Sequence, residues 1–582
     1  MFNRFAFLTI LLCAMSGAVR ANTWTAATCG HTDVASAITS ASEGDTVTIP
    51  AGTCAWSLGV TISKGLIIQG AGSGRIIAIN QDVLTVATGT LSITIQAARA
   101  DGTYPLGPTT SQTLRVFQVG HSSNWMQGTV TSFNSGTGAL VMNITSTSGT
   151  TADLQQHHWA VATIPSTIIQ YNVSGSMFYM TESTTTHSSL GGIKITHGTG
   201  IGNGASVIGF NYATNGLAMI VHDMWFEWNQ ADVLDSNTNR GLIYNCSFDA
   251  SPYAMQFGTF DIKTSTSPII NSWTTASTWG SADTTGQGNF YIETNDYHGY
   301  LVAAANDDNG RLVFRYNFLD NAGFGTHGAD TSPYGQRYVE YYNNKGLYTG
   351  YSDGHSTFNM TNGWVYIRGG SLVIHDNNLQ AISGGSDQGP APDAKISIFN
   401  LREGASGSNP SDSCWGAGTS GGARYHAPRQ PGFGRVTGAG TDGLGRSSDE
   451  TTYVGDSEPI YMWNNTRIPT VSVFDYSPNT CTSPDTAANY IVSGRDYFTN
   501  TAKPGYTPST YPHPLAGLAS PPPPPVAPAT NMFAGTLSKS VPITFTIPAT
   551  VGSLTYTNTV TVPISWTCSC KTNPTSCSCI VK

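Results

Sequence analysis

The sequence predicts an all-β fold, and three observations support that prediction. The 582 residues include 64 Gly and 26 Tyr, and Ser, Thr and Asn are also abundant. β-Branched and aromatic residues suit strands, whereas Gly and Asn suit turns. Charged residues make up only 10% of the chain, and long helical patterns are nearly absent. An elongated all-β architecture can use most of a chain of this length as one body.

The formal net charge of −9 bears on the class of partner. Binding to phosphates relies on clustered Lys and Arg, which an acidic chain supplies poorly. We therefore expect no nucleic-acid partner. A neutral ligand, or an anionic ligand that local cations attract, is compatible with this composition.

The first 21 residues have the three parts of a secretory signal peptide. Arg4 lies in a charged start, the apolar run Phe5–Met15 follows, and Val19-Arg20-Ala21 resembles a cleavage site. The apolar run is too short to span a bilayer, and no later segment reaches roughly 18 consecutive apolar residues. The sequence thus predicts a secreted or cell-surface protein without a membrane span.

One of the 10 cysteines lies in the predicted signal peptide, which leaves an odd number in the exported chain. Export favours disulfides, and an odd count requires at least one unpaired thiol. Cys246 lies in an apolar strand pattern, where a free cysteine behaves as a small hydrophobe. We predict that Cys246 is free and that disulfides join Cys29 to Cys54 and Cys414 to Cys481. The other four cysteines lie near the C-terminus.

A short helix and a series of strands follow the signal peptide. Thr32 or Asp33 can cap a helix whose Val34, Ala37 and Ile38 share one face. Strands are then expected over three stretches: Thr46–Ile49, Val60–Ile62 and Leu66–Ile68. A helix followed by such strands would close the open end of a stacked sheet.

This segment resembles the N-terminal cap of secreted right-handed parallel β-helix proteins, the pectate-lyase-like superfamily, through GDTVTIPAGTC and GLIIQGAG. Later units each place an Asn or Cys near the turn after an apolar strand: GLIYNCSF, RLVFRYNF, YVEYYNNK, SLVIHDNN and PIYMWNNT. In such folds, asparagines at successive turns hydrogen-bond along the axis. Asn317, Asn344 and Asn378 recur at spacings that fit one coil with its loops. The resemblance covers Cys29–Leu515 and implies a right-handed parallel β-helix with a short N-terminal capping helix.

Residues 101–166 interrupt this rhythm. The stretches VFQVG, QGTVTSFNSGTGALVMNIT and HHWAVATI suggest paired strands joined by Gly and Asn turns. We therefore expect an antiparallel β insertion beside the β-helix. Further along, Trp225 and Trp228 either stack on sugar rings or fill the core.

The C-terminal part changes composition twice. Residues 383–457 are rich in Gly, Ser and Pro, as long functional or disordered connections are. Residues 519–530, with SPPPPPVAPA at their centre, are typical of a stiff polyproline linker. Residues 531–582 alternate apolar and polar side chains, which predicts a small Cys-containing β module. The predicted domains are a signal peptide (1–21), a β-helix domain (22–518), the linker (519–530) and the module (531–582).

The candidate working surface is Asn306–Asn344, where charged residues are dense. Side chains alternate faces along a strand, so Arg311 and Arg315 point outward if Leu312 and Phe314 point inward. Stacked coils then bring the outward side chains together on one exposed exterior face. The candidate substrate-binding residues on it are Arg315, Glu340 and Tyr342. An exposed salt bridge between Arg315 and Glu340, worth about 1 kcal/mol at most, explains part of the same pattern.

The resemblance implies a carbohydrate-active enzyme, and we expect a lyase that cleaves a polysaccharide containing uronic acids. β-Elimination requires a neutralised carboxylate, removal of the α proton and protonation of the leaving oxygen. His327 is the candidate proton-transfer group. Arg311 and Arg337 are candidate partners of the carboxylate or oxyanion, and Asp330 is a candidate orienting group.

Calcium is the only cofactor that the sequence suggests, because it prefers several carboxylate and carbonyl oxygens. Asp307 and Asp308 are the candidate calcium ligands. The run Asp307-Asp308-Asn309-Gly310 is also compatible with a plain turn, since Asp, Asn and Gly all favour turns.

Two other functions stay open, because a fold does not determine a function. One is a non-catalytic glycan-binding surface, adhesin or tailspike-like β-helix. The other is a glycoside hydrolase, in which Asp307, Asp308 and Asp330 would supply carboxylates roughly 6.5–9.5 Å apart. The chain shows no clear match to the catalytic arginine neighbourhood of pectate lyases and no firm pair of stacked aspartates like that of polygalacturonases. The expected partner is in each case an extracellular polysaccharide, and the sequence leaves the oligomeric state open.

Overall fold

The structure is a computed structural model in which the chain divides into two compact units, Met1–Ala519 and Ser520–Lys582. The residues that it describes are 21–80, 82–104, 107–119, 121–149, 159–173, 175–197, 206–211, 213, 216–227, 233–238, 240–249, 260–262, 288–298, 301–305, 310–320, 322–326, 338–348, 365–367, 371–381, 395–400, 433–436, 455–457, 459–466, 470–475, 491–517, 537–544, 559–570 and 577–581. No helix among these residues is long and apolar enough to cross a membrane.

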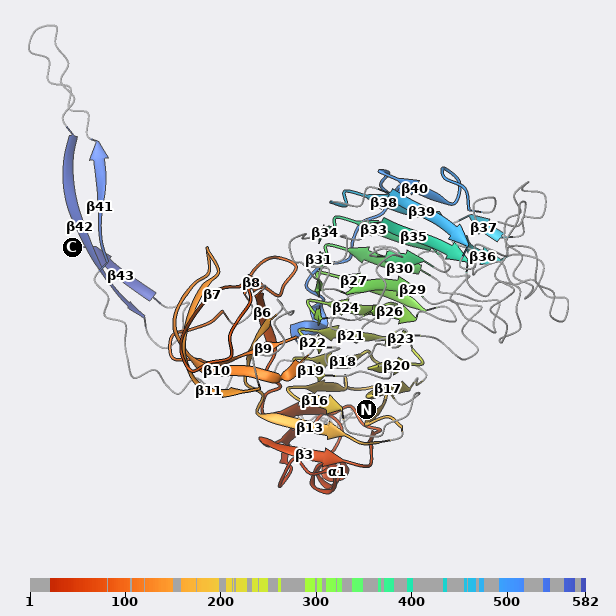
Figure 1. Cartoon of the computed structure of the whole chain (residues 1–582), viewed down its shortest axis with the longest axis horizontal. Helices are drawn as coiled ribbons and strands as arrows, with labels where there is room; N and C mark the ends of the chain where they lie inside the picture. The colour runs from red at the N-terminus through yellow and green to blue at the C-terminus, as the bar shows by residue number, and fades with distance from the viewer. Residues whose placement is uncertain are drawn as a thin grey trace, which may run out of the picture. The chain divides into compact units, whose positions relative to one another are not determined.

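The first unit winds through three parallel sheets, A, B and C (Figure 1). Sheet A contains, in spatial order, β1 (Thr23–Thr25), β2 (Thr46–Ile49), β5 (Ile67–Gly70), β15 (Ser189–Gly191), β18 (Met219–His222), β21 (Gly241–Tyr244), β24 (Phe290–Glu293), β27 (Arg311–Arg315), β30 (Tyr338–Tyr342), β33 (Ser371–His375), β38 (Ile460–Trp463) and β40 (Tyr497–Thr499). Sheet B contains β3 (Gly52–Trp56), β13 (Thr167–Tyr171), β16 (Lys194–His197), β19 (Trp225–Glu227), β22 (Ser247–Asp249), β25 (Asp296–His298), β28 (Phe318–Asp320), β31 (Lys345–Tyr348) and β34 (Asn378–Ala381). Sheet C contains β4 (Val60–Ile62), β14 (Phe178–Thr181), β17 (Ile208–Asn211), β20 (Leu234–Ser236), β23 (Phe260–Ile262), β26 (Leu301–Ala305), β29 (Gly323–Thr326), β32 (Val365–Ile367), β35 (Lys395–Asn400) and β39 (Thr470–Asp475).

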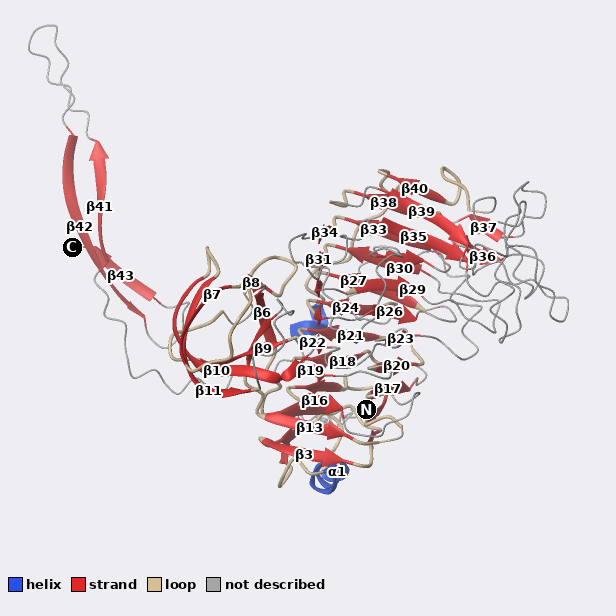
Figure 2. Ribbon diagram, in the orientation of Figure 1, coloured by secondary structure: helices blue, strands red, loops and turns tan. Residues whose placement is uncertain are grey.

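Each full coil contributes one strand to each sheet, and each strand pairs in parallel with its counterpart in the next coil. For example, β24, β25 and β26 pair with β27, β28 and β29 in turn. This arrangement is a parallel β-helix, as predicted, and the described residues are almost entirely strand and loop (Figure 2).

The core lies inside the coils and is built by alternation along each strand. Leu312 and Phe314 of β27 point inward, as do Val339 and Tyr341 of β30. Like residues stack along the axis, so the rings of Phe314 and Tyr341 lie 5.5 Å apart and nearly parallel. Burial of these apolar side chains is the main force that holds the coils together.

The predicted capping helix is α1 (His31–Ser40), which buries Val34, Ala37 and Ile38 at the N-terminal end of the coils. The predicted side-chain cap is wrong. Gly30 is the N-cap residue and makes no side-chain cap, while the candidate caps lie within the first turn. Asp33 instead accepts a hydrogen bond of 2.5 Å from the hydroxyl of Thr28.

The predicted asparagine ladder is present at the turns between sheets A and B. The side-chain amide of Asn317 donates to Oδ1 of Asn344 at 3.3 Å, and the amide of Asn344 donates to Oδ1 of Asn377 at 3.0 Å. The ladder continues in both directions, because Asn295 donates to Asn317 and Asn377 donates to Asn465. The ladder residue of the coil after Asn344 is therefore Asn377. Asn378, which the sequence spacing suggested, is the first residue of β34.

The insertion is a seven-stranded antiparallel sheet. Its strands are β6 (Ile76–Asn80), β7 (Gly89–Thr94), β8 (Gln96–Ala97), β9 (Thr113–Gln118), β10 (His121–Asn134), β11 (Ala139–Ser148) and β12 (Trp159–Thr163). It begins at Ile76, earlier than residue 101, because β6 already leaves the coils to pair with β12. One of its faces packs on the outer side of sheet B through apolar residues such as Phe117, Trp225 and Phe318.

Residues 501–517, the terminal segment, run along the outer face of sheet A and include the 3-10 helix η2 (Pro514–Gly517). Leu515 packs there against Ile220 and Leu242. The remaining strands of this unit are the antiparallel pair β36 (Phe433–Val436) and β37 (Gly455–Ser457).

The disulfide predicted between Cys29 and Cys54 is present, with the two Cα atoms 5.8 Å apart. Cys246 is free and buried, as predicted. The predicted pair Cys414 and Cys481 lies outside the described residues.

The second unit contains a three-stranded antiparallel sheet. Its strands are β41 (Leu537–Thr544), β42 (Thr559–Cys570) and β43 (Cys577–Val581). The register sets Cys568 opposite Cys579 and Cys570 opposite Cys577.

Candidate functional site

The outer face of sheet A carries the candidate substrate-binding residues in the predicted register. Arg315 of β27 is the register partner of Tyr342 in β30, one coil further on. Both point away from the core, because the neighbouring Phe314 and Tyr341 fill it. The predicted closeness is correct, since Nη1 of Arg315 donates to the hydroxyl of Tyr342 at 2.8 Å.

The expectation that this face is exposed is wrong. Arg315 is 0% exposed, and Glu340 and Tyr342 are each 1% exposed. The terminal segment covers all three side chains. A polysaccharide therefore has no access to them while residues 501–517 stay in place.

Arg315 fastens the terminal segment to the β-helix. Its Nη1 donates to the backbone and hydroxyl oxygens of Ser509, each at 2.9 Å, and its Nη2 donates to the carbonyl of Thr510 at 2.8 Å. Its ion-pair partner is Glu293, at 2.7 Å, rather than Glu340. Burial disfavours the charged guanidinium, but Glu293 outweighs this effect and raises the pKa of Arg315.

Glu340 has a partner in the same segment. The hydroxyl of Tyr506 donates to Oε2 of Glu340 at 2.7 Å, and Nε2 of His375 lies 3.3 Å from the same hydroxyl. Burial raises the pKa of Tyr342 to about 12, while Arg315 acts in the opposite direction. Glu340 and Arg315 therefore both attach the terminal segment to the β-helix.

Three of the four candidate catalytic residues, His327, Arg337 and Asp330, lie outside the described residues. The candidate calcium ligands Asp307 and Asp308 lie outside them as well.

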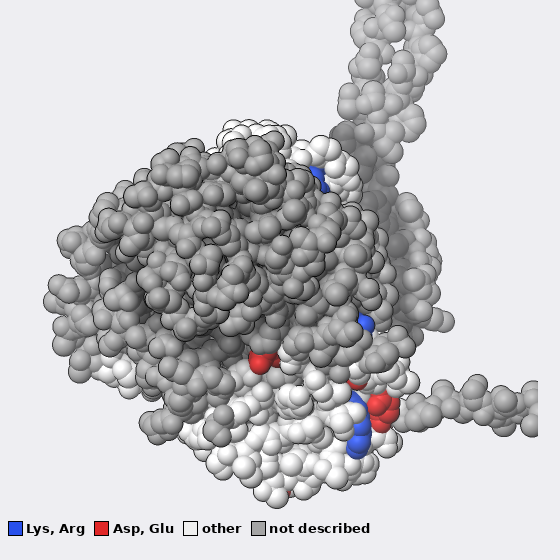
Figure 3. Space-filling view, turned by 90° about the vertical axis from the view of Figure 1, so that its right-hand side faces the viewer, with Lys and Arg blue, Asp and Glu red and all other residues white. Residues whose placement is uncertain are grey.

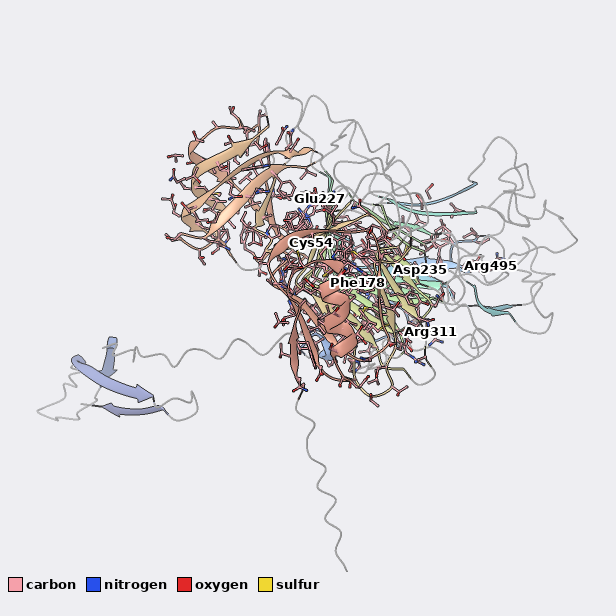
Figure 4. All side chains as sticks on the ribbon, turned by 90° about the horizontal axis from the view of Figure 1, so that it is seen from below. Cys54, Phe178, Glu227, Asp235, Arg311 and Arg495 are labelled. Atoms are coloured by element: carbon pink, nitrogen blue, oxygen red, sulfur yellow. A yellow bond between two sulfur atoms is a disulfide. The ribbon has the colours of Figure 1, made fainter. Side chains whose placement is uncertain are left out.

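Arg311 is the candidate catalytic residue that the structure describes, at the start of β27 with 6% of its surface exposed. Figure 4 labels it. No group of three or more His, Cys, Asp or Glu suited to a metal occurs among the described residues. A calcium site at the sequence candidates therefore stays a prediction.

A fully buried charged cluster lies between the insertion and sheet B. Both ring nitrogens of His298 contact carboxylates, Nδ1 at 2.9 Å from Asp320 and Nε2 at 3.0 Å from Asp296. Arg75, just before β6 of the insertion, pairs with Asp296 at 3.3 Å. This cluster joins the insertion to the coils and has no opening to a substrate, since His298 and Asp296 are 0% exposed.

Sheet C presents a different outer face. Its outer row is a line of register partners that alternate with core residues: Thr61, Tyr179, Gly209, Asp235 and Asp261. Tyr179 is 38% exposed. A Cβ atom at Gly209 would lie 2.9 Å from Cδ2 of Tyr179, so the glycine makes room for the ring.

Asp235 follows Gly209 in this row and is half-buried (Figure 4). The described part of the face in Figure 3 carries few charged side chains. An exposed aromatic ring, a small neighbour and a carboxylate in one line form a surface on which a sugar ring can stack and donate a hydroxyl.

Sequence reasoning missed this row. The signal was present, because Tyr179, Gly209 and Asp235 are each the middle residue of the short patterns FYM, IGF and LDS. Each pattern is too short to show alternation, so the shared row emerges only when the coils are stacked.

Comparisons with known proteins do not assign a family. No protein-family model matches the chain, and no curated protein matches its sequence. Among solved structures, the chain is similar to the Gp54 tailspike of Acinetobacter baumannii bacteriophage AP22, determined in complex with A. baumannii capsular saccharide. The similarity covers 61% of this chain and 62% of the tailspike chain, so it spans less than two thirds of that protein, at 8% identity and a TM-score of 0.15. A TM-score this low supports no argument about function, and the assignment as a β-helix rests on the sheets described above.

Proposed function

We propose that this chain is an extracellular β-helix protein that binds a polysaccharide along the outer row of sheet C. The observation that carries the proposal is the exposed ring of Tyr179 beside Gly209 and Asp235. The terminal segment covers sheet A and the insertion packs on sheet B, whereas Thr61 and Tyr179 in the outer row of sheet C are exposed. The disulfide between Cys29 and Cys54 supports export, since disulfides persist in oxidising compartments.

The reaction that we propose is β-elimination in a polysaccharide that contains uronic acids. Its support is the charge-dense sequence of Asn306–Asn344, in which Arg311 is the first residue of β27 and has 6% of its surface exposed. In this proposal Arg311 and Arg337 neutralise the sugar carboxylate and His327 transfers the proton. In the same proposal, the chain is related to the pectate-lyase-like superfamily.

Glycoside hydrolysis is the second candidate, and one observation favours it. Asp235 and Asp261 are register partners on neighbouring strands of sheet C. Neighbouring strands lie about 4.8 Å apart, so these two positions are adjacent along the sheet, and glycoside hydrolysis uses two carboxyl groups.

One experiment separates these reactions. The full chain is incubated with polygalacturonate, alginate and chondroitin while absorbance from unsaturated uronates and the number of new reducing ends are followed. Both signals together support β-elimination, whereas reducing ends without absorbance indicate hydrolysis. Binding without either signal would leave a non-catalytic glycan-binding protein and would contradict the lyase proposal.

The binding surface is tested by Tyr179→Ala. Loss of a stacked ring is expected to weaken binding of the recognised polysaccharide roughly two- to tenfold. Leu58→Ala is the matched control, because Leu58 is also an exposed apolar residue, at 62%. Equal affinity of wild type and Tyr179→Ala in a titration would remove sheet C as the binding surface.

A further inference from the structure

The insertion meets the coils at a cluster of aromatic and charged side chains that the proposed sheet C surface does not use. The ring of Phe117 in β9 packs on Trp225 of β19, with centroids 5.8 Å apart. Beside this contact, Arg115 is the register partner of Gln127, and Lys194 is the register partner of Trp225. Figure 4 shows Glu227, two residues after Trp225, where the insertion and the coils adjoin.

Arg115 is held in place without being neutralised. Its Nε and Nη2 donate to Oε1 of Gln127 at 3.2 and 2.8 Å, and its guanidinium carbon lies 4.3 Å from the ring centroid of Trp125. Both partners are neutral. Among the described residues no carboxylate pairs with Arg115, and its Nη1 makes no hydrogen bond. The guanidinium is thus oriented, with one edge left for a ligand.

The facing residues of sheet B do not supply the missing negative charge. Glu227 is engaged by Lys194 at 2.8 Å, and the same Nζ lies 3.6 Å from the ring centroid of Trp225. Both side chains are partly accessible, at 13% and 16%. Arg115 and Lys194 together carry two positive charges and Glu227 carries one negative charge, which leaves one net positive charge here in a chain of net charge −9.

Because Arg115 is half-buried, this excess positive charge destabilises the protein when no anionic ligand is bound. Burial lowers the pKa of Arg115, and Glu227 acts against this effect. A half-buried arginine usually gains a carboxylate or phosphate partner, because its planar fork matches two oxygens at once. Trp125, which is only partly buried, adds an apolar ring with a polar edge, the kind of surface on which pyranose rings pack.

We infer that Arg115, Trp125, Gln127 and Lys194 form a second saccharide site that selects an acidic sugar, with the sugar carboxylate on Arg115. The inference rests on the proposed function in that the ligand is a saccharide, and it adds the substrate class. The carboxylate takes the free edge of the guanidinium, the ring stacks against Trp125, and Lys194 adds positive charge on the opposite wall. The site is separate from the outer row of sheet C.

The test is calorimetric titration of the full chain with oligomers of galacturonate, mannuronate and hyaluronan. Each oligomer is used as the free acid and as its methyl ester, so that only the charge differs. Wild type is expected to bind the preferred acid more tightly than its ester. Arg115→Gln is expected to reduce that preference roughly tenfold, as the loss of a charged hydrogen bond does.

Two further variants separate charge from geometry and from general damage. Arg115→Lys keeps the charge but loses the fork held by Gln127, so an intermediate preference is expected. Arg99→Gln is the matched control, because Arg99 already pairs with Asp101 at 3.4 Å. Its preference for the acid is expected to equal that of wild type.

The outcomes distinguish this site from the proposed function. Equal binding of acid and ester by wild type, or an unchanged preference in Arg115→Gln, overturns the acidic-sugar site even when binding that depends on Tyr179 persists. Absence of binding to every oligomer overturns both proposals. A sulfated oligosaccharide that binds through Arg115 more tightly than any carboxylated one assigns the site to sulfate and overturns the carboxylate assignment.

Discussion

Single side chains with two partners stabilise this β-helix where apolar stacking alone would leave polar backbone groups unpaired. Asn317 shows this role. Its Oδ1 accepts hydrogen bonds from the backbone and side chain of Asn295, and its Nδ2 donates to the carbonyl of Ile292. These groups are buried, and a buried polar group without a partner costs about 1–3 kcal/mol. The ladder therefore links successive coils by hydrogen bonds.

The ladder predicts graded effects of substitution. Asn317→Ala, in the middle of the ladder, is expected to lower the free energy of unfolding by about 2–4 kcal/mol, because partners on both sides lose their bonds. Asn465→Ala, at the last described rung and partly exposed, is expected to cost less, since fewer groups are left unpaired. Urea unfolding of both variants measures this difference, and equal losses would contradict a cooperative ladder.

At the scale of elements, the terminal segment buries the outer face of sheet A. Tyr511 stacks on Tyr316, and the backbone N–H of His513 donates to Glu293. Arg315 lies between these contacts and binds the segment with two of its nitrogens, Nη1 and Nη2. Removal of one partner from a buried ion pair leaves an uncompensated charge.

Arg315→Gln is expected to destabilise the protein by about 3–5 kcal/mol and to free residues 501–517. Glu340→Gln is the contrasting variant, because its amide oxygen can still accept the hydrogen bond from Tyr506. Limited proteolysis with mass spectrometry is expected to show early cleavage within the terminal segment only in Arg315→Gln. Early cleavage in neither variant would mean that the apolar contacts of Leu515 suffice.

At the scale of the whole first unit, the insertion and the coils are joined by apolar packing and by the buried cluster around His298. Burial opposes a charged imidazole, but the hydrogen bonds to Asp296 and Asp320 outweigh it and raise the pKa of His298 to about 10. The pKa of an unfolded histidine is about 6.5. A raised pKa stabilises the folded state fully below about pH 6.5, and this stabilisation is lost as pH rises towards 10.

His298→Gln removes this dependence. At pH 6 the free energy of unfolding of wild type is expected to exceed that of the variant by an amount on the order of a few kcal/mol. This difference is expected to shrink steadily up to about pH 10. Parallel melting curves across this range, with Arg75 and both carboxylates intact, provide the measurement. A difference that grows with pH would show that His298 is neutral in the folded protein.

Much of this architecture follows from local sequence. The alternation of Leu312 and Phe314 with Arg311 and Arg315 determined which side chains fill the core, because an unpaired charge cannot be buried there. An Asn after each apolar strand predicted the ladder, and paired cysteines near the N-terminus predicted the one disulfide seen among the described residues. These features repeat within one coil, so a short stretch of sequence contains them.

The tertiary structure alone decided which outward faces are open. Arg315 is bound by Ser509, 194 positions later in the chain, so no local pattern marks it as buried. The row of Tyr179, Gly209 and Asp235 joins three coils, and the cluster around Arg115 joins two sheets. The periodicity of a strand sets the direction in which a side chain points, whereas long-range packing sets what meets it there.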